Sequence, residues 1–240
     1  MTSPLNPLIP AISQIEDIVS SIPGWTPIDQ LYTLFTLVRA TEHLEGDILE
    51  IGSWCGRSTV ILAAAASCTG NTIVHAVDLF PAKSDWSQNP DGSYSFKVSL
   101  DASLLEGYQD QTVWKEPFER DIAPLYESYN SVFDIFSESL SKANVEDYVR
   151  SYRGDSSLIP GLPLSKVRLA FIDADHSFSA VCQDIKNAET KLVQGGYICF
   201  DDAFSHYDGV NQAIRELIID SGKYDFCQQM TRKLFVARLK

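Results

Sequence analysis

Three aspartates follow two apolar runs of the chain and form its clearest chemical cluster. Asp173 follows the run 167–172, and Asp201 and Asp202 directly follow the run 197–200. Carboxylates that gather in one place raise each other's pKa, and a bound cation relieves that repulsion. Oxygen ligands suit Mg²⁺, or Ca²⁺ or Mn²⁺, and the lack of nitrogen or sulfur ligands argues against zinc. We therefore predict that Asp173, Asp201 and Asp202 bind a divalent metal ion.

This metal prediction carries a geometric condition at Asp201 and Asp202. Successive side chains of a strand point to opposite faces, so both can bind one ion only if the strand geometry breaks there. If it does not break, one of the two aspartates merely caps the segment that follows.

A proton acceptor lies close to these acids in the run Phe171-Ile-Asp-Ala-Asp-His-Ser. His176 has an ordinary pKa of about 6.5, which suits the removal of a proton at neutral pH. Asp175 would need surroundings that raise its pKa to do the same. We expect one of the two, His176 or Asp175, to act as a catalytic base. The alternative for His176 is that it supports a metal ligand or begins a helix.

A glycine turn within residues 47–59, Asp-Ile-Leu-Glu-Ile-Gly-Ser-Trp-Cys-Gly-Arg-Ser-Thr, predicts a second kind of site. Residues 48–51 resemble a short buried strand, and an Ala-rich helix begins near Ser58. Gly52 and Gly56 let the backbone bend and let a ligand approach it closely. Free N–H groups at the start of the helix attract a carboxylate or a phosphate. The pattern predicts a nucleotide-cofactor site, although an ordinary strand-to-helix turn uses the same glycines.

Trp54 and Asp78 narrow the choice of nucleotide. A dinucleotide loop has the pattern G-x-G-x-x-G, and Trp54 stands where its second glycine would be. A nicotinamide oxidoreductase is therefore disfavoured, whereas the amino and carboxylate groups of a methionine would fit. Asp78 ends the predicted strand 72–77, where its carboxylate can accept hydrogen bonds from two ribose hydroxyls.

Strands and helices alternate along the chain, which predicts an α/β fold with a mostly parallel sheet covered on both faces. In such sheets ligands bind at the carboxyl ends of the strands, where the acids described above fall. The glycine pair 195–196 is expected to end a helix. The expected strands are 48–51, 72–77, 148–152, 167–172, 197–200 and 233–239, and the expected helices are 28–38, 57–67, 131–143, 179–192 and 210–219.

Composition limits the partners of this protein. A length of 240 residues fits a single domain, 1–240, and a net charge of −13 opposes binding to nucleic acid or to anionic membranes. Five scattered cysteines without CxxC spacing, and a start without a signal peptide, predict a cytoplasmic protein with reduced thiols. We expect a homodimer. Residues 1–25 form either an arm across the partner or a cover for their own core.

Residues 81–130 interrupt the α/β pattern. This segment combines eight aromatic residues with many acids and turn residues. Its length suggests a functional loop, and its aromatic content argues against plain disorder. We expect an irregular insertion that folds over the site as a lid and selects the substrate. The alternative is a surface excursion with its own small core or a subunit contact.

Four runs together carry a family resemblance: Glu50 to Thr59, Val77-Asp78, Phe171 to Ser177, and Gly195 to Asp202. They resemble class I S-adenosylmethionine (SAM)-dependent methyltransferases. They are most similar to the metal-dependent macrocin, mycinamicin and novobiocin sugar O-methyltransferase group. The likeness covers about residues 22–80 and 130–240 and leaves out the insertion. This group tolerates a residue other than glycine at the position of Trp54.

The resemblance implies a Rossmann-like, mostly parallel seven-stranded sheet with an antiparallel C-terminal strand. It also implies roles for particular residues. Asp78 would hold the ribose of SAM, Asp155 and Ser156 would lie beside the adenine, and Asp175 or His176 would be the base. Asp173 would serve both the metal and the cofactor, and the residues around the methionine part would be Glu50, Gly52, Ser53, Gly56 and Ser58.

These observations lead to one hypothesis for the activity. We expect a SAM-dependent O-methyltransferase, assisted by Mg²⁺, that acts on a hydroxyl of a small natural product such as a sugar, a polyketide or a peptide-derived metabolite. The alternatives on the same fold are an N- or S-methyltransferase and a non-catalytic SAM-binding partner subunit.

Overall fold

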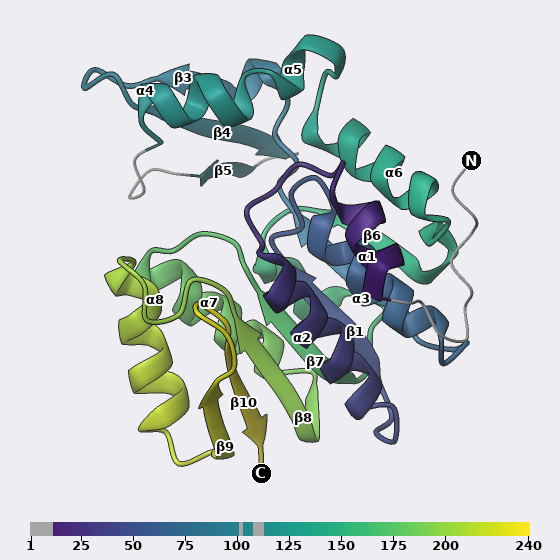
Figure 1. The fold of residues 1–240 in the computed structure, drawn as a ribbon. Coiled ribbons are helices and arrows are strands. Elements are labelled where there is room, and N and C mark those ends of the chain that lie inside the picture. Colours follow the sequence, from purple (N-terminus) through teal and green to yellow (C-terminus); the bar gives the residue numbers. More distant parts are fainter. Residues whose placement is uncertain (1–11, 101–102, 108–112) are drawn as a thin grey trace.

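The computed structural model describes residues 12–100, 103–107 and 113–240, and its centre is a twisted seven-stranded sheet (Figure 1). The strand order is β6-β2-β1-β7-β8-β10-β9, and β10 alone runs in the direction opposite to the other six strands of this sheet. The predicted α/β fold, with an antiparallel strand near the end of the chain, is confirmed. The strands are β1 (Asp47–Ile51), β2 (Val74–Asp78), β6 (Val149–Arg153), β7 (Val167–Ile172), β8 (Leu192–Phe200), β9 (Tyr224–Gln229) and β10 (Phe235–Leu239).

Helices cover both faces of this sheet. One face packs against α2 (Ile28–Ala40), α3 (Arg57–Ser67) and α6 (Val132–Ala143), and α1 (Ile12–Val19) lies outside them. The other face packs against α7 (Phe178–Glu189), α8 (Asp208–Ala213) and the π-helix that continues it, Ile214–Ile219. Short 3₁₀ turns are Lys83–Asp85, Glu146–Tyr148 and Ser156–Gly161. Within the described ranges, no helix has the length and apolar character needed to cross a membrane.

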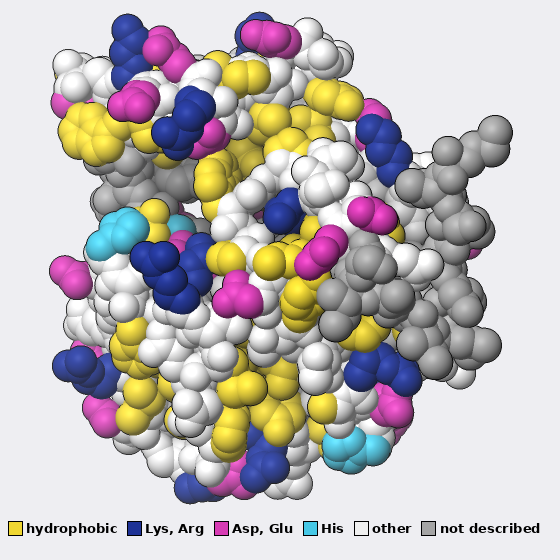
Figure 2. Space-filling view, viewed as in Figure 1, with side chains coloured by type: hydrophobic (Ala, Val, Ile, Leu, Met, Phe, Trp, Pro, Cys, Tyr) yellow, Lys and Arg dark blue, Asp and Glu magenta, His cyan; other side chains and the backbone are white. Residues whose placement is uncertain are grey.

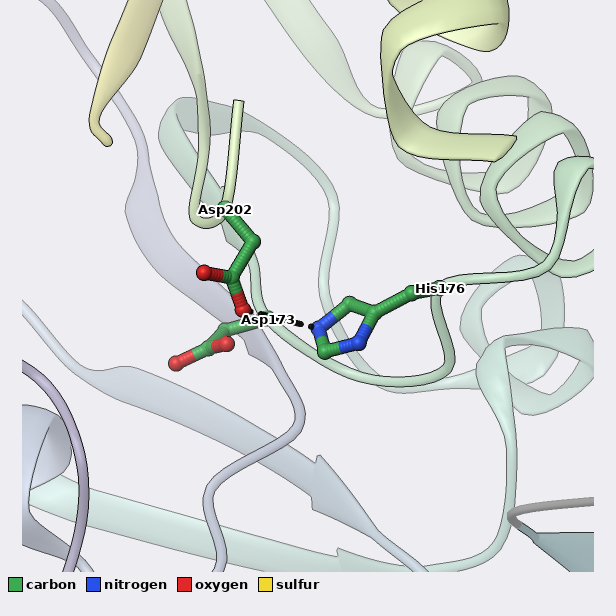
Figure 3. Close-up of side chains that lie close together, drawn as sticks. All are labelled: Asp173, His176 and Asp202. Carbon is green, nitrogen blue, oxygen red and sulfur yellow. Dashed lines mark ion pairs between the residues drawn. The ribbon is translucent and has the colours of Figure 1, made fainter. Parts of the chain in front are cut away.

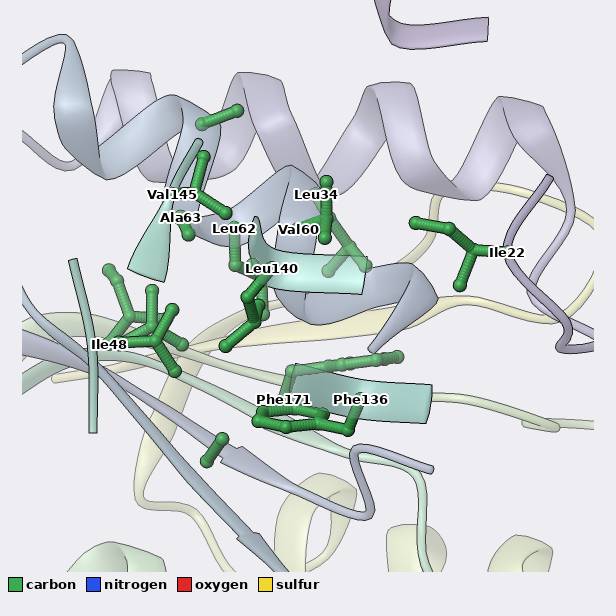
Figure 4. Close-up of a cluster of buried hydrophobic side chains, with 14 of the residues drawn as sticks. Ile22, Leu34, Ile48, Val60, Leu62, Ala63, Phe136, Leu140, Val145 and Phe171 are labelled. Atoms are coloured by element: carbon green, nitrogen blue, oxygen red, sulfur yellow. The ribbon is translucent and has the colours of Figure 1, made fainter. Parts of the chain in front are cut away.

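The core follows from the alternation of side chains along each strand. Ile48 and Phe171 point to one face, where Leu62 and Phe136 meet them from α3 and α6 (Figure 4). Leu49, Ala170 and Ile172, which adjoin them along the strands, belong to the hydrophobic cluster on the opposite face. All six residues of β7 are buried, as expected for a central parallel strand covered on both faces.

Two expectations for the regular elements were wrong. The glycine pair 195–196 lies inside β8 instead of ending a helix, because α7 already ends at Glu189. The register between β7 and β8 shifts nearby, and a Cβ at Gly196 would lie 2.9 Å from the carbonyl oxygen of Val193. Strand β9 had no counterpart among the expected elements.

The described residues of the insertion form regular elements rather than an irregular loop. It holds a three-stranded antiparallel sheet of β3 (Trp86–Gln88), β4 (Tyr94–Leu100) and β5 (Ser103–Gly107), followed by α4 (Lys115–Pro117), a π-helix (Phe118–Ile122) and α5 (Leu125–Ser128). Its aromatic rings pack on one another. Tyr94 stacks on Phe118 with ring centroids 3.8 Å apart, and Trp86 meets Phe96 edge-on at 4.9 Å. The segment therefore has a small core of its own.

Candidate functional site

A cavity of about 670 Å³ opens at the carboxyl ends of β1, β2, β7 and β8. Figure 2 shows the hollow between the insertion and the α/β body, with hydrophobic side chains along the insertion's side. Both the glycine turn and the acid cluster line this one cavity. The insertion contributes Phe96, Glu106, Gly107, Val113, Pro117 and Arg120 to its wall.

Gly52 is required by the protein's own backbone. Its φ is +89°, and a Cβ there would lie 2.0 Å from the carbonyl oxygen of Asp173. No side chain fits in that space, so the ends of β1 and β7 approach each other only with glycine at this position. The same turn thereby fixes Asp173 beside Gly52 in the wall of the cavity.

Asp78 organises the turn through its carboxylate. Oδ2 accepts the backbone N–H groups of Ser53 and Trp54 at 2.9 Å each, and Oδ1 accepts that of Phe80 at 2.6 Å. Burial raises the pKa of Asp78, and these three hydrogen bonds offset part of the rise. Trp54 takes a left-handed φ of 45°, which explains why glycine suits its position in such turns. Ser53 and Ser58 line the cavity beside Asp78.

Glu50 and Gly56, both predicted to bind the cofactor, lie outside the lining of the cavity. Glu50 is fully buried beneath the turn and accepts a hydrogen bond from the Thr59 hydroxyl of α3. Burial raises its pKa to about 7. Gly56, with φ +87°, is the N-cap of α3 and packs against Phe136. Both residues therefore support the turn from the side that faces away from the cavity. Among the residues that the structure describes, no side chain caps the α3 N-terminus, which leaves its first N–H groups available to an anion.

The acid cluster gathers Asp173, His176 and Asp202. One ligand atom from each lies within 4.8 Å of the others, and the three side chains point toward one another (Figure 3). His176 Nε2 is 3.3 Å from Asp202 Oδ2. Asp202 follows β8 in a left-handed conformation, with φ of 52°, so the strand geometry breaks here as the sequence required. Burial and the charges of Asp201 and Asp202 raise the pKa of Asp173 well above its ordinary range.

Asp201, the third predicted metal ligand, has other partners. Gln30 Nε2 and the Asp202 N–H donate to its Oδ1, at 2.9 and 2.7 Å. Lys233 Nζ lies 3.2 Å from its Oδ2 and 3.1 Å from Asp202 Oδ1. Sequence reasoning missed Gln30 and Lys233. An acid-rich site is a signal to search for a buried lysine, but nothing local pointed to these two positions.

Residues 49–203, more than half of the sequence, match the family model described as a methyltransferase domain. This chain belongs to that family. Its predicted resemblance to class I SAM-dependent methyltransferases is confirmed.

Solved structures of O-methyltransferases share the fold of this methyltransferase. The O-methyltransferase NovP aligns over 89% of this chain and 80% of its own, with a TM-score of 0.63 and 15% identity. An O-methyltransferase from Bacillus cereus in complex with SAH aligns over 97% and 93%, with a TM-score of 0.59 and 18% identity. CalS11, a TDP-rhamnose 3'-O-methyltransferase, aligns over 95% and 92%, with a TM-score of 0.55 and 12% identity.

The remaining predicted residues of the methyltransferase also line the cavity. Asp175 accepts the N–H of Ser177 at 2.8 Å, at the start of α7. Asp155 caps the 3₁₀ turn 156–161, and the Ser156 hydroxyl accepts a hydrogen bond from Asn187 at 3.1 Å. Asp155 and Ser156 therefore lie on the wall that follows β6, beside Asp78.

His176 is held in place by packing. The Tyr207 ring lies 4.1 Å from the His176 ring, and a Cβ at Gly209 would lie 2.4 Å from the His176 carbonyl oxygen. Burial lowers the pKa of His176, although the charges of Asp202, Asp201 and Asp175 oppose this. The imidazole is thus favoured in its neutral form, which can bind a metal ion or accept a proton.

Proposed function

We propose that this protein is a SAM-dependent O-methyltransferase that acts on a small hydroxylated natural product. One observation carries the proposal: the glycine turn with Asp78 and the cluster of Asp173, His176 and Asp202 line the same cavity. A cofactor on the first half would present its methyl group to an acceptor on the second. Methyl transfer needs alignment of the two partners, exclusion of water and removal of one proton.

The half of the cavity that is formed by the glycine turn and Asp78, here called the cofactor half, supports SAM as the cofactor in three ways. The uncapped N-terminus of α3 suits the methionine carboxylate. The Asp78 carboxylate lies at the cavity wall, where it suits ribose hydroxyls, and Asp155, which also lines the cavity, would lie beside the adenine. Trp54, in the place of the second dinucleotide glycine, disfavours a larger pyrophosphate. SAM-bound relatives such as TomG, in complex with SAM, have the same fold.

Calorimetric titration with SAM tests this half. We expect binding in the micromolar range for the wild type, and binding at least tenfold weaker for Asp78→Asn, because an amide cannot accept all three backbone N–H bonds. The matched control is Asp91→Asn, since Asp91 also accepts a backbone N–H, that of Ser93, but lies in the insertion. Absence of SAM binding at high micromolar concentration would refute the proposed cofactor.

For the metal ion we propose Asp173, Asp202 and His176 as ligands, in place of the three aspartates. Two carboxylates and a neutral imidazole within 4.8 Å fit a divalent ion, whereas Asp201 is engaged by Gln30 and Lys233. The imidazole shifts the preference from Mg²⁺ toward Mn²⁺ or a later transition metal. When bound, such an ion lowers the pKa of an acceptor hydroxyl and orients it.

The proton of the acceptor has two candidate destinations, Asp175 and His176. If His176 holds the ion, Asp175 takes the proton. Comparison of His176→Gln with Asp175→Asn separates the roles. Loss of a ligand weakens Mn²⁺ binding, and loss of a base lowers kcat by about 100-fold while Mn²⁺ binding persists. If both variants keep the Mn²⁺ affinity of the wild type, His176 is not a ligand of the metal ion.

The acceptor would lie beneath the insertion, which lines the cavity with both apolar and charged side chains. We propose that this insertion acts as the lid and selects the substrate. CalS11 acts on TDP-rhamnose, and TomG takes part in tomaymycin synthesis, so related proteins methylate hydroxyls of such compounds. A panel of sugars, phenols, amines and thiols, assayed with methyl-labelled SAM, tests the choice of atom. Labelled amines or thiols without labelled hydroxyls would favour the N- or S-methyltransferase. If no compound is labelled, the result would favour a non-catalytic partner subunit.

A further inference from the structure

Lys233 places a positive charge beside the carboxylates of Asp201 and Asp202. Its ammonium lies 3.2 Å from Asp201 Oδ2 and 3.1 Å from Asp202 Oδ1, and its side chain is 19% exposed. Each of these two contacts is an ion pair between the ammonium and a carboxylate oxygen. The residue is therefore a resident cation within the cavity wall.

The two oxygens of Asp202 face different cations. Oδ1 lies against Lys233, and Oδ2 lies against His176 in the cluster that could hold a metal ion. Asp201 stays on the lysine side, because Gln30 and Lys233 occupy its oxygens. A divalent ion could therefore bind on the Oδ2 side of Asp202, while Lys233 occupies the Oδ1 side.

The charges of this arrangement balance when both cations are present. Three ionised carboxylates carry −3, and one lysine with one divalent ion carries +3. Without the lysine, the ion would meet an excess negative charge and be held more tightly. With the lysine, the carboxylates stay together even when the ion leaves.

We propose that Lys233 is a built-in counter-cation that limits the affinity of the divalent metal site and keeps the acid cluster assembled when no ion is bound. The inference rests on the metal site of the proposed function. It goes beyond that site because it assigns the lysine a competing charge rather than a supporting role. An ion bound under these conditions exchanges readily.

A supporting role makes the opposite prediction. If Lys233 only oriented Asp202 as a ligand, its removal would weaken metal binding. If it opposes the ion, its removal strengthens metal binding, since two cations close together repel each other. The backbone carbonyl of Lys233 accepts the Ala203 N–H at 2.9 Å whatever the side chain, so a substitution there keeps this link of the fold.

Mn²⁺ binding, measured by the loss of the free-ion EPR signal, tests the inference on the full chain. We expect Lys233→Met to bind Mn²⁺ at least about tenfold more tightly than the wild type, and Lys233→Arg to stay within about threefold of it. The control is Lys223→Met, which removes a lysine from an exposed pair with Glu189. Melting temperatures give a second readout: metal-free Lys233→Met should melt below the wild type, and saturating Mn²⁺ should remove the deficit.

Three results would overturn the inference. Unchanged or weaker Mn²⁺ binding by Lys233→Met shows that the lysine does not oppose the ion. A melting deficit that Mn²⁺ fails to remove shows that the charge is not the reason. Absence of Mn²⁺ binding in every variant refutes the metal site itself, while SAM titration still reports on the cofactor half. If Lys233→Met does not fold, Lys233→Gln takes its place with the same expected sign.

Discussion

The two halves of the cavity are built by different forces. In the cofactor half, backbone groups determine the geometry: Asp78 accepts three main-chain N–H groups, and Gly52 fits against the Asp173 carbonyl. In the acid half, side-chain charges determine it, through the contacts of Asp202 with His176 and Lys233. A backbone-built half is complete without any ligand. A charge-built half responds to every cation that enters it.

The largest effect is expected where the halves meet, at Gly52. In Gly52→Ala the new Cβ would overlap the Asp173 carbonyl oxygen at a strained φ. We expect a loss of about 3 kcal/mol or more in unfolding free energy and no measurable SAM binding. Urea unfolding and SAM titration measure both. Gly161→Ala is the control, because no atom of the described residues would lie within 4 Å of its new Cβ and its φ is ordinary. Equal stability of the two variants would show that β1 and β7 can separate without cost.

The next largest effect separates the halves. Asp202→Asn removes charge from the acid half alone, so Mn²⁺ affinity should fall by about 100-fold or more while SAM affinity changes less than about threefold. Asp225→Asn, at an exposed pair with Arg238, controls for the general loss of negative charge. The distinction between the halves fails if SAM and Mn²⁺ affinities fall together.

A third prediction concerns the pH dependence of stability and Glu50, which is buried beneath the glycine turn. Burial raises the pKa of Glu50 from 4.5 to about 7, so the folded protein keeps a proton that the unfolded chain loses. The stability of the wild type should therefore fall as pH rises from about 4.5 to about 7 and stay level above that. Glu50→Gln should remove this fall and gain about 1–3 kcal/mol on the wild type between pH 4.5 and 8.

Urea unfolding at four pH values measures the Glu50 effect. The difference between Glu50→Gln and the wild type isolates this residue from other acids. Asp184, buried on the opposite face with a pKa of about 7, provides a comparison, since Asp184→Asn should leave the Glu50 difference intact. A difference that stays constant with pH would mean that Glu50 is charged in the folded protein.

The smallest effect is expected at Asp155, on the rim of the cofactor half. Asp155→Ala removes a cap, because Oδ1 accepts the Ser157 N–H at 3.0 Å. We expect a loss of about 1 kcal/mol or less in stability and a roughly threefold loss in SAM affinity. Ser131→Ala removes a comparable cap from α6 and should leave SAM affinity unchanged. A larger loss of SAM affinity at Asp155 would indicate a direct contact with the cofactor.

The same contrast explains what could be predicted from the sequence. The glycine turn and Asp78 are short-range patterns, and the strands that carry them are continuous apolar runs, so their positions were predicted. The partners of Asp201 were not, because Gln30 lies 171 residues away and no local pattern joins the two. Strand β9 was missed because five of its six residues are exposed, so the strand has no apolar run. The sheet of the insertion was missed although Tyr94–Leu100 alternates apolar and polar residues, which is the pattern of a half-buried strand.

The place of β10 has a consequence for folding. This strand lies between β8 and β9 although it follows both along the chain. Strand β9 therefore cannot join the sheet before β10 has docked, and such long-range pairing is slow. Lys233 precedes β10 by two residues, so it reaches Asp201 and Asp202 as that strand docks. Docking of β10 between β8 and β9 therefore also delivers the positive charge that neutralises these acids.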